Sequence, residues 1–215
     1  FWTEGDSPVV LNPNILISDP ENDLITDASI RLVDFVSGDV LGITSPSPFT
    51  PGFDSNTGIL SLTGSGTVAQ MQAALRTVVF SHSTDDPGQG GTDNTRAVNF
   101  QVTDSNGASS TQSGNIQIGI TSVNDAPTFT GLPTDISVQD GVQSNVDLSA
   151  AIFGDPDSGT GTVRLALTVV DGTLTANSTP EVTITGSGTE DIFLEGTAPA
   201  LEDYLNSPSN IKFTN

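Results

Sequence analysis

Carboxylate side chains recur in this chain at matched spacing, and oxygen ligands of this kind suit a hard cation. Glu4-Gly5 is followed by Asp19-Pro20-Glu21, and Asp140-Gly141 is followed at the same spacing by Asp155-Pro156-Asp157. Val123-Asn124-Asp125-Ala126-Pro127 lies between the two stretches. Calcium takes about 6–8 oxygen ligands from carboxylates, amides, backbone carbonyls and water. Repeated acidic clusters on either side of a short Asn-Asp-Pro segment therefore predict calcium sites between extracellular β-domains.

Several loops have to converge to build such a site, because no single loop carries enough oxygen ligands. In an up-and-down sandwich the loops alternate between the two ends, so the acidic residues should gather at the ends. The cluster expected at the junction of the two domains consists of Glu4, Asp6, Asp85, Asp86, Asn124, Asp125, Asp155 and Asp157.

A second cluster is expected at the opposite end of the first domain. Asp140 takes the place of Glu4 in the second domain, and we expect that it binds nothing. We also expect metal binding at the second cluster to be weaker or absent, since half of its junction would lie before Phe1. The predicted members of this second cluster are Asp19, Glu21, Asp23 and Asp104.

The charge balance excludes two classes of function. The chain has 26 acidic and 5 basic residues and a net charge of −21. Nucleic-acid binding needs Lys and Arg to neutralise phosphate, and an anionic membrane surface would repel this chain. The sequence contains no cysteine, so a bound metal is the remaining way to brace a small secreted domain. No apolar window approaches 18 residues, so we expect no membrane insertion.

Strand-forming segments alternate with Gly, Pro, Asn and Asp throughout the chain, which predicts an all-β protein. Segments such as Ile30–Val33 and Ile59–Leu62 can bury one face, which argues against disorder despite the acidity. In the first domain we predict strands at 9–17, 28–36, 58–63, 77–82, 96–103 and 113–122.

A short helix is predicted from Thr67 to Arg76, with Thr67 as its N-cap, because Val68, Met71 and Leu75 fall on one helical face.

The second half of the chain repeats the same order of elements. The matched segments are Leu60-Leu62-Gly64 with Ile192-Leu194-Gly196, Met71 and Leu75 with Leu201 and Leu205, Val78-Val79-Phe80 with Ile211-Lys212-Phe213, and Arg31-Leu32 with Arg164-Leu165.

The repeat predicts two domains, 1–125 and 126–215. The first domain continues well beyond Phe80, but the second ends soon after Phe213, so we expect the second to lack its last two strands. We expect the first to lack part of its N-terminal strand, because Asp140 has more of its own domain before it than Glu4 has. An open sheet edge would invite strand exchange or aggregation.

These motifs together resemble the cadherin-like tandem repeats of very large secreted bacterial proteins, including RTX-type adhesins and biofilm proteins. The resemblance implies two tandem immunoglobulin/cadherin-like β-sandwiches, each with a short helix between two strands, the second truncated. It further implies calcium at domain junctions, neighbouring repeats of the same polypeptide as partners, and a place outside the bacterial cell or on its surface. The motifs are Glu4-Gly5-Asp6, Ser18-Asp19-Pro20-Glu21, Thr57-Gly58-Ile59-Leu60, Ala73-Ala74-Leu75-Arg76, Val102-Thr103-Asp104 and Val123 to Pro127.

Enzymatic function has little support in the sequence. His82 is the only histidine, and a Ser-His-Asp arrangement with Asp85 or Asp86 lacks any nucleophile motif. We therefore interpret His82 as a solvated residue at a strand end and expect no enzyme. The alternative function is calcium-dependent binding of cell-surface or matrix polysaccharide, with Phe49 and Phe53 as stacking residues if they are exposed.

Overall fold

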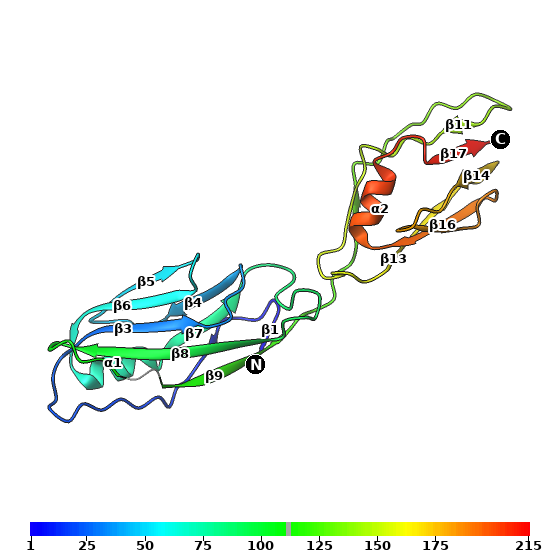
Figure 1. Ribbon diagram of the computed structural model, residues 1–215. Coiled ribbons are helices and arrows are strands. Elements are labelled where there is room, and N and C mark those ends of the chain that lie inside the picture. Colours follow the sequence, from blue (N-terminus) through cyan, green and yellow to red (C-terminus); the bar gives the residue numbers. More distant parts are fainter. Residues whose placement is uncertain (111–112) are drawn as a thin grey trace. The chain divides into compact units, whose positions relative to one another are not determined.

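The computed structural model describes residues 1–110 and 113–215, and the chain divides into two compact units. Unit 1 comprises Phe1–Val123 and unit 2 comprises Asn124–Asn215 (Figure 1). In the described residues, both consist mostly of β-strands, and each has one short helix. The prediction of an all-β protein is confirmed.

The described residues of unit 1 form two sheets. The larger is six-stranded, in the order β1-β9-β8-β3-β6-β5, and the smaller has the order β2-β7-β4. Every pair of neighbouring strands is antiparallel except β1 and β9, which run parallel. The elements are β1 (Trp2–Thr3), β2 (Val9–Val10), β3 (Ile25–Leu32), β4 (Asp39–Ile43), β5 (Thr50–Asp54), β6 (Ile59–Gly66), α1 (Val68–Leu75), β7 (Val78–His82), β8 (Thr95–Asp104) and β9 (Ser113–Thr121).

The core of unit 1 is formed by residues from both sheets and from α1. Alternate residues of β3 point inward, so Ala28, Ile30 and Leu32 are buried while Arg31 is exposed. Phe80 of β7 is fully buried and lies edge-on to the Trp2 ring, with 5.9 Å between ring centroids. The period of two along these strands places their apolar side chains in one shared core.

Helix α1 begins where it was predicted to begin. Thr67 is the N-cap, its side chain accepts a hydrogen bond from the backbone N–H of Gln70, and the Gln70 side chain accepts one from the N–H of Thr67. This reciprocal capping box satisfies two N–H groups that the helix leaves unpaired. Met71 and Leu75 are buried, as the helical spacing predicted.

Unit 2 has a smaller set of strands. Its sheets have the orders β13-β16-β15, β11-β17-β14 and β10-β12, all with antiparallel pairing. The helix α2 has Thr197 as its N-cap, and its Leu201 and Leu205 are buried. The elements are β10 (Thr128–Thr130), β11 (Ser144–Asn145), β12 (Ile152–Gly154), β13 (Val163–Thr168), β14 (Thr173–Ala176), β15 (Thr183–Thr185), β16 (Asp191–Gly196), α2 (Ala198–Leu205) and β17 (Ile211–Thr214).

Some strand predictions for unit 1 are wrong. Only Val9–Val10 of the predicted strand 9–17 forms a strand, and β3 begins at Ile25, earlier than expected. Strand β5 was missed because Pro51 and Gly52 disfavour strands. The sheet tolerates Pro51 because β5 lies at its edge. Strand β4 was missed for a related reason, since Gly42 interrupts its apolar pattern.

Strand pairing corrects two of the matches between the units. Leu60 and Ile192 are matched positions of the two units. Ile30 pairs with Leu60, and Leu167 pairs with Ile192, so Leu167 corresponds to Ile30. The predicted match of Arg31-Leu32 with Arg164-Leu165 is therefore wrong.

The glycine that corresponds to Gly196 is Gly66, and the predicted match with Gly64 is wrong. Gly66 and Gly196 are both buried and both directly precede the N-cap threonine of a helix. A Cβ would lie 2.7 Å from a Phe49 ring atom at Gly66 and 2.7 Å from the carbonyl oxygen of Glu181 at Gly196. Unit 1 has an irregularity in this region, where the pairing of β3 with β6 shifts between Ile25 and Asp27.

Candidate functional site

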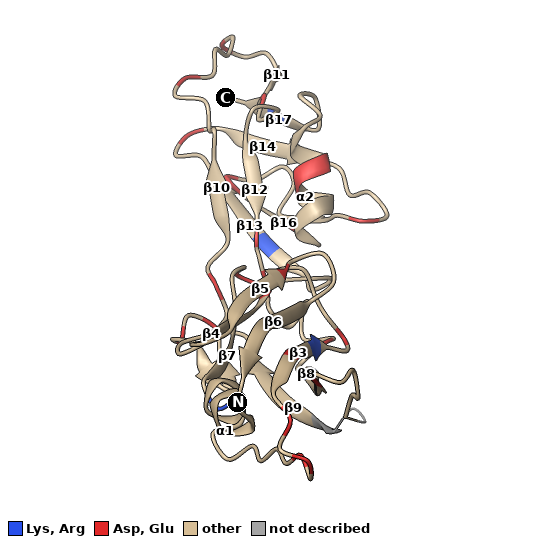
Figure 2. Ribbon diagram, turned by 90° about the vertical axis from the view of Figure 1, so that its left-hand side faces the viewer, with Lys and Arg blue, Asp and Glu red and all other residues tan. Residues whose placement is uncertain are grey.

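Acidic residues lie mainly in the loops that join the strands (red in Figure 2), and three of them meet at one end of unit 1. One carboxylate oxygen from each of Asp19, Asp23 and Asp104 lies within 4.8 Å of the others. Asp104 ends β8, and the other two lie in the segment before β3. The pairing of Ile25 with Asp104 brings these parts of the chain together.

Backbone hydrogen bonds orient two of these carboxylates. Oδ1 of Asp19 accepts from the N–H of Glu21 at 2.9 Å and from that of Asp23 at 3.3 Å. Oδ1 of Asp104 accepts from the N–H of Asn106 at 2.8 Å and from that of Ala108 at 2.9 Å. Turn-forming Asp residues commonly make such bonds, which leave the second oxygen of each carboxylate available to a ligand.

The third carboxylate is held by a side chain from another loop. The Asn106 Nδ2 group donates to Oδ2 of Asp23 at 2.6 Å, across the gap between the loop before β3 and the loop after β8. All three carboxylates are half-buried. Three like charges this close repel one another, and a divalent cation among them would replace that repulsion with attraction. Glu21 was predicted to belong to this cluster, but it is exposed and does not belong to the group of three.

The unit 1 members of the predicted junction set are Glu4, Asp6, Asp85 and Asp86. Carboxylate oxygens of Glu4 and Asp85 lie within 4.8 Å of each other. Glu4 also accepts a hydrogen bond from the N–H of Val123 at 2.8 Å. Both carboxylate oxygens of Asp86 accept from the N–H of Gly90, so Asp86 closes its own loop. Asp6 is exposed.

The unit 2 members form a compact group. Oδ2 of Asp157 accepts from the N–H of Asp125 at 3.0 Å, and Asn124 donates from Nδ2 to the carbonyl oxygen of Asp125 at 3.0 Å. Oδ1 of Asp155 is buried without a hydrogen-bond partner. Desolvation raises the pKa of the Asp155 carboxyl above its ordinary value, and the nearby Asp157 raises this pKa further.

The Asp155 oxygen has the chemistry of a ligand for a hard cation. A buried carboxylate oxygen with no donor costs free energy, and a hard cation would satisfy it. The repulsion between Asp155 and Asp157 would be removed by the same ion. Asp140, expected to bind nothing, accepts a hydrogen bond at Oδ1 from Nδ2 of Asn215 at 3.2 Å.

His82 is not the solvated residue that the sequence suggested. Its side chain is fully buried, with Nδ1 2.8 Å from Oδ1 of Asp39 and Nε2 2.6 Å from Oγ1 of Thr84. The order hydroxyl, imidazole, carboxylate is that of a catalytic triad. However, Asp39 is shared with the buried Arg96, whose Nε donates to Oδ2 at 2.6 Å, and Trp2 lies against the imidazole. These contacts favour a structural role for the three residues.

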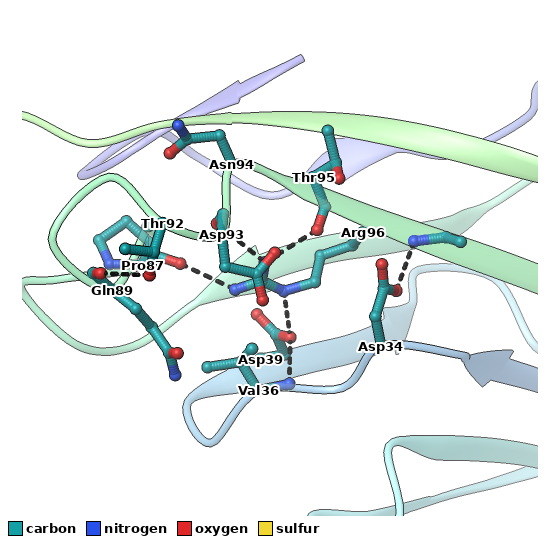
Figure 3. A network of polar contacts seen from close by, with 12 residues as sticks. Asp34, Val36, Asp39, Pro87, Gln89, Thr92, Asp93, Asn94, Thr95 and Arg96 are labelled. Atoms are coloured by element: carbon teal, nitrogen blue, oxygen red, sulfur yellow. Dashed lines mark hydrogen bonds and ion pairs between the residues drawn. The ribbon is translucent and has the colours of Figure 1, made fainter.

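Arg96 is the largest fully buried side chain of the described residues, and sequence reasoning missed it (Figure 3). Beside its bond to Asp39, its guanidinium donates to the carbonyl oxygens of Pro87, Asp93 and Thr95. It also forms an ion pair with the Asp93 carboxylate at 3.1 Å. Arg96 therefore fastens the loop between β7 and β8 to the core. The isolated Arg in an alternating strand was the only signal in the sequence.

The aromatic pair of the alternative function does not have the expected exposure. Phe49 is 4% exposed and belongs to the core of unit 1, where it contacts Gly66. Phe53 is partly buried and packs against the same core. The assignment of Phe49 as a sugar-stacking residue is therefore wrong, since a stacking platform has to be accessible.

Comparison with protein-family models and with well-characterised proteins finds no match to this chain. In residues 1–110 and 113–215, no helix is long and apolar enough to cross a membrane.

Proposed function

We propose that this chain is a calcium-binding structural repeat of an extracellular bacterial adhesin, built from immunoglobulin-like or cadherin-like sandwiches. Calcium would stabilise the loop ends of each unit and stiffen the segment that joins neighbouring repeats of the same polypeptide. Adhesion or biofilm formation would follow from the extended string of such repeats. The proposal includes no catalytic activity.

The observation that carries the proposal is the convergence of Asp19, Asp23 and Asp104 within 4.8 Å of one another. Asp19 and Asp23 lie in the segment before β3, and Asp104 ends β8. Among the described residues, no Lys or Arg side chain donates a hydrogen bond to these carboxylates. In a chain of net charge −21, such a cluster is destabilising unless a cation shares it. The buried, unpartnered oxygen of Asp155 supports a second site in unit 2.

A calcium titration followed by thermal unfolding tests the proposal. Trp2 reports on unit 1 and Tyr204 on unit 2, because the chain has one residue of each type. Ligand at about 100 times its Kd stabilises a native state by about 2.7 kcal/mol. For a unit of this size, that corresponds to an increase in melting temperature of about 10 °C.

The variant Asp104→Asn should remove most of the calcium-dependent increase for unit 1. Asparagine keeps an oxygen that can accept the hydrogen bonds from Asn106 and Ala108, so the metal-free fold should survive. Asp54→Asn is the matched control, because Asp54 lies near the opposite end of β6 from Gly66 and makes the same change in charge. An absent response to millimolar calcium in the unmodified chain would refute the proposal.

The predicted junction set is tested in the same way with Asp125→Ala and Asp157→Ala. Small-angle scattering with and without calcium measures whether the particle becomes longer and stiffer. Elongation that both variants abolish would support stiffening by calcium. Calcium binding without any change in scattering would limit the function of the ion to stability within each unit.

A further inference from the structure

The loop after β8 contains a tight turn that requires a glycine. The backbone N–H of Gly107 donates to the carbonyl oxygen of Asp104 at 3.3 Å, and Gly107 has a φ of +86°. A residue with a side chain is strained at this φ, and turns favour aspartate at their first position and glycine at their fourth. The turn therefore fixes the glycine that follows Asn106. Asn106-Gly107 is the single Asn-Gly pair of the chain.

An asparagine that precedes glycine can react with its own backbone. The nitrogen of the following residue attacks the side-chain carbonyl carbon, and glycine hinders this attack least because it has no Cβ. The surroundings of Gly107 add no hindrance, since no heavy atom of the described residues lies within 4 Å of the place where its Cβ would be. Asn106 is exposed, so water has access to the side chain.

The two reacting groups are held by few contacts. The hydrogen bond of the Gly107 N–H is 3.3 Å long, which is beyond the usual range for such a bond. The side-chain amide of Asn106 donates from Nδ2 to Oδ2 of Asp23 at 2.6 Å. The attacking nitrogen is therefore restrained by one weak hydrogen bond, while the amide that it attacks lies directly beside a carboxylate.

Asn56 provides a comparison within the same unit. It is exposed in the turn between β5 and β6, and its N–H donates to Oδ1 of Asp54 at 2.9 Å. Asn106 has the same relation to Asp104, whose Oδ1 accepts from the Asn106 N–H at 2.8 Å. Each side-chain amide also donates to a carboxylate. The residue after Asn56 is Thr57, and its β-branched side chain crowds the backbone nitrogen.

We propose that Asn106 is a site of spontaneous deamidation, which adds a fourth negative charge to the cluster of Asp19, Asp23 and Asp104. The backbone nitrogen of Gly107 forms a bond to Cγ of Asn106, and the bond from Cγ to Nδ2 breaks. Nδ2 leaves as ammonia with the proton that the Gly107 nitrogen loses. Water then opens the cyclic succinimide at either carbonyl group, which leaves aspartate or isoaspartate at position 106. In sum, one water is added and one ammonia is lost, without oxidation or reduction.

The new carboxylate changes how unit 1 responds to cations. An oxygen in the place of Nδ2 of Asn106 turns the 2.6 Å hydrogen bond to Asp23 into a contact between two negative charges. Without a cation, deamidation therefore destabilises the loops that carry the cluster. With calcium in the cluster, the same oxygen is a further ligand. The effect in calcium rests on the proposed function, whereas the reaction and its effect without a cation do not.

Prolonged incubation of the full chain in mildly alkaline buffer with a calcium chelator tests the reaction. Peptide mass spectrometry and the release of ammonia should show conversion at Asn106 at least about tenfold faster than at Asn56. The same incubation in urea gives the rates for the unfolded chain. Conversion of Asn106 no faster than that of Asn56, or conversion of Asn106 in urea only, would overturn the proposal.

The variants Asn106→Asp and Asn106→Ala separate the added charge from the lost hydrogen bond. Both lack the donor to Asp23, but only Asn106→Asp adds a carboxylate. In chelator at low salt, the melting temperature of unit 1, followed by Trp2 fluorescence, should be about 3–8 °C lower for Asn106→Asp than for Asn106→Ala. Sodium chloride should narrow this difference because it screens the repulsion. Equal melting temperatures in chelator would overturn the effect on the cluster.

Calcium should reverse the order of the two variants. Asn106→Asp should bind calcium about tenfold more tightly than Asn106→Ala, because the added carboxylate is a further ligand. Equal affinities in a chain that does bind calcium would show that position 106 is not a ligand. An unmodified chain without any calcium response would refute the proposed function, whereas the mass spectrometry and the comparison in chelator would still decide the deamidation.

Discussion

Replacement of Arg96 by methionine should strongly destabilise unit 1. The guanidinium is fully buried and is bonded to Asp39, to Asp93 and to three backbone carbonyls. Methionine fills a similar volume but leaves the Asp39 carboxylate buried with the His82 imidazole and the N–H of Val36 as its partners. Removing one member of a buried ion pair costs about 3–5 kcal/mol. This is a large part of the total stability of a small domain, which is about 5–15 kcal/mol.

Urea unfolding followed by Trp2 fluorescence measures this cost, because Trp2 lies in unit 1 against Phe80 and His82. With a slope of about 1–3 kcal/mol per molar urea, the midpoint should fall by at least about 1 M. The double variant Arg96→Met with Asp39→Leu should be more stable than the sum of the two single changes predicts. Arg96→Met alone leaves the buried Asp39 carboxylate without its guanidinium, and Asp39→Leu alone leaves the buried guanidinium without that carboxylate, whereas the double variant contains neither charge.

Arg164→Met is the matched control for this experiment. Arg164 pairs with Glu195 at 3.4 Å, and both side chains are substantially exposed, so the loss should be about 0–1 kcal/mol and should not affect the Trp2 transition. A cost below about 1 kcal/mol for Arg96→Met would show that water or a rearranged loop compensates Asp39. The interpretation of Arg96 as the fastening of the loop between β7 and β8 would then be wrong.

Three further predictions concern other parts of the chain. Phe49→Ala should cost unit 1 about 3–5 kcal/mol in urea unfolding, because Phe49 is a core residue, and a stable variant with changed polysaccharide binding would contradict this. Thr67→Ala should cost about 1 kcal/mol through the lost capping bond to Gln70, measured by the same Trp2 transition. For Asp155 the folded-state pKa is raised, so without metal the ionised carboxylate destabilises unit 2 above that pKa, and stability should increase as the pH falls through it. In chelator at neutral pH, Asp155→Asn should increase the melting temperature monitored by Tyr204 and flatten its dependence on pH. In calcium, the same variant should have a lower melting temperature than the unmodified chain. A melting temperature that Asp155→Asn leaves unchanged at every pH would contradict both the pKa direction and the metal site.

Local signals in the sequence predicted the local structure well. Thr67 is the N-cap of α1, as predicted, and the apolar i, i+4 pairs of both helices were visible in the sequence. Asp19 and Asp104 could be assigned to turns because each bonds to backbone N–H groups only a few residues away. Such interactions depend on neighbours in the chain, so a single sequence contains them.

Contacts between distant segments could not be predicted in the same way. Asp39 and Arg96 are separated by 57 residues, and nothing near either residue marks them as partners. Phe49 lies in a Pro-rich segment that has the composition of an exposed loop, but Gly66 leaves room for its ring in the core. Burial of these side chains is decided by which strands pair, and a single sequence gives that information only weakly.

The internal repeat supplies part of the missing long-range information, because the second unit can be compared with the first in the same chain. Aligned by sequence alone, Arg31 matched Arg164, and the alignment was wrong because unit 1 has a bulge next to β6. Aligned by strand pairing, Ile30 matches Leu167, and the N–H of Leu32, which donates to Gly58, corresponds to that of Val169, which donates to Glu190. That agreement shows that strand pairing, more than similarity of residue types, decides which positions of the two units correspond.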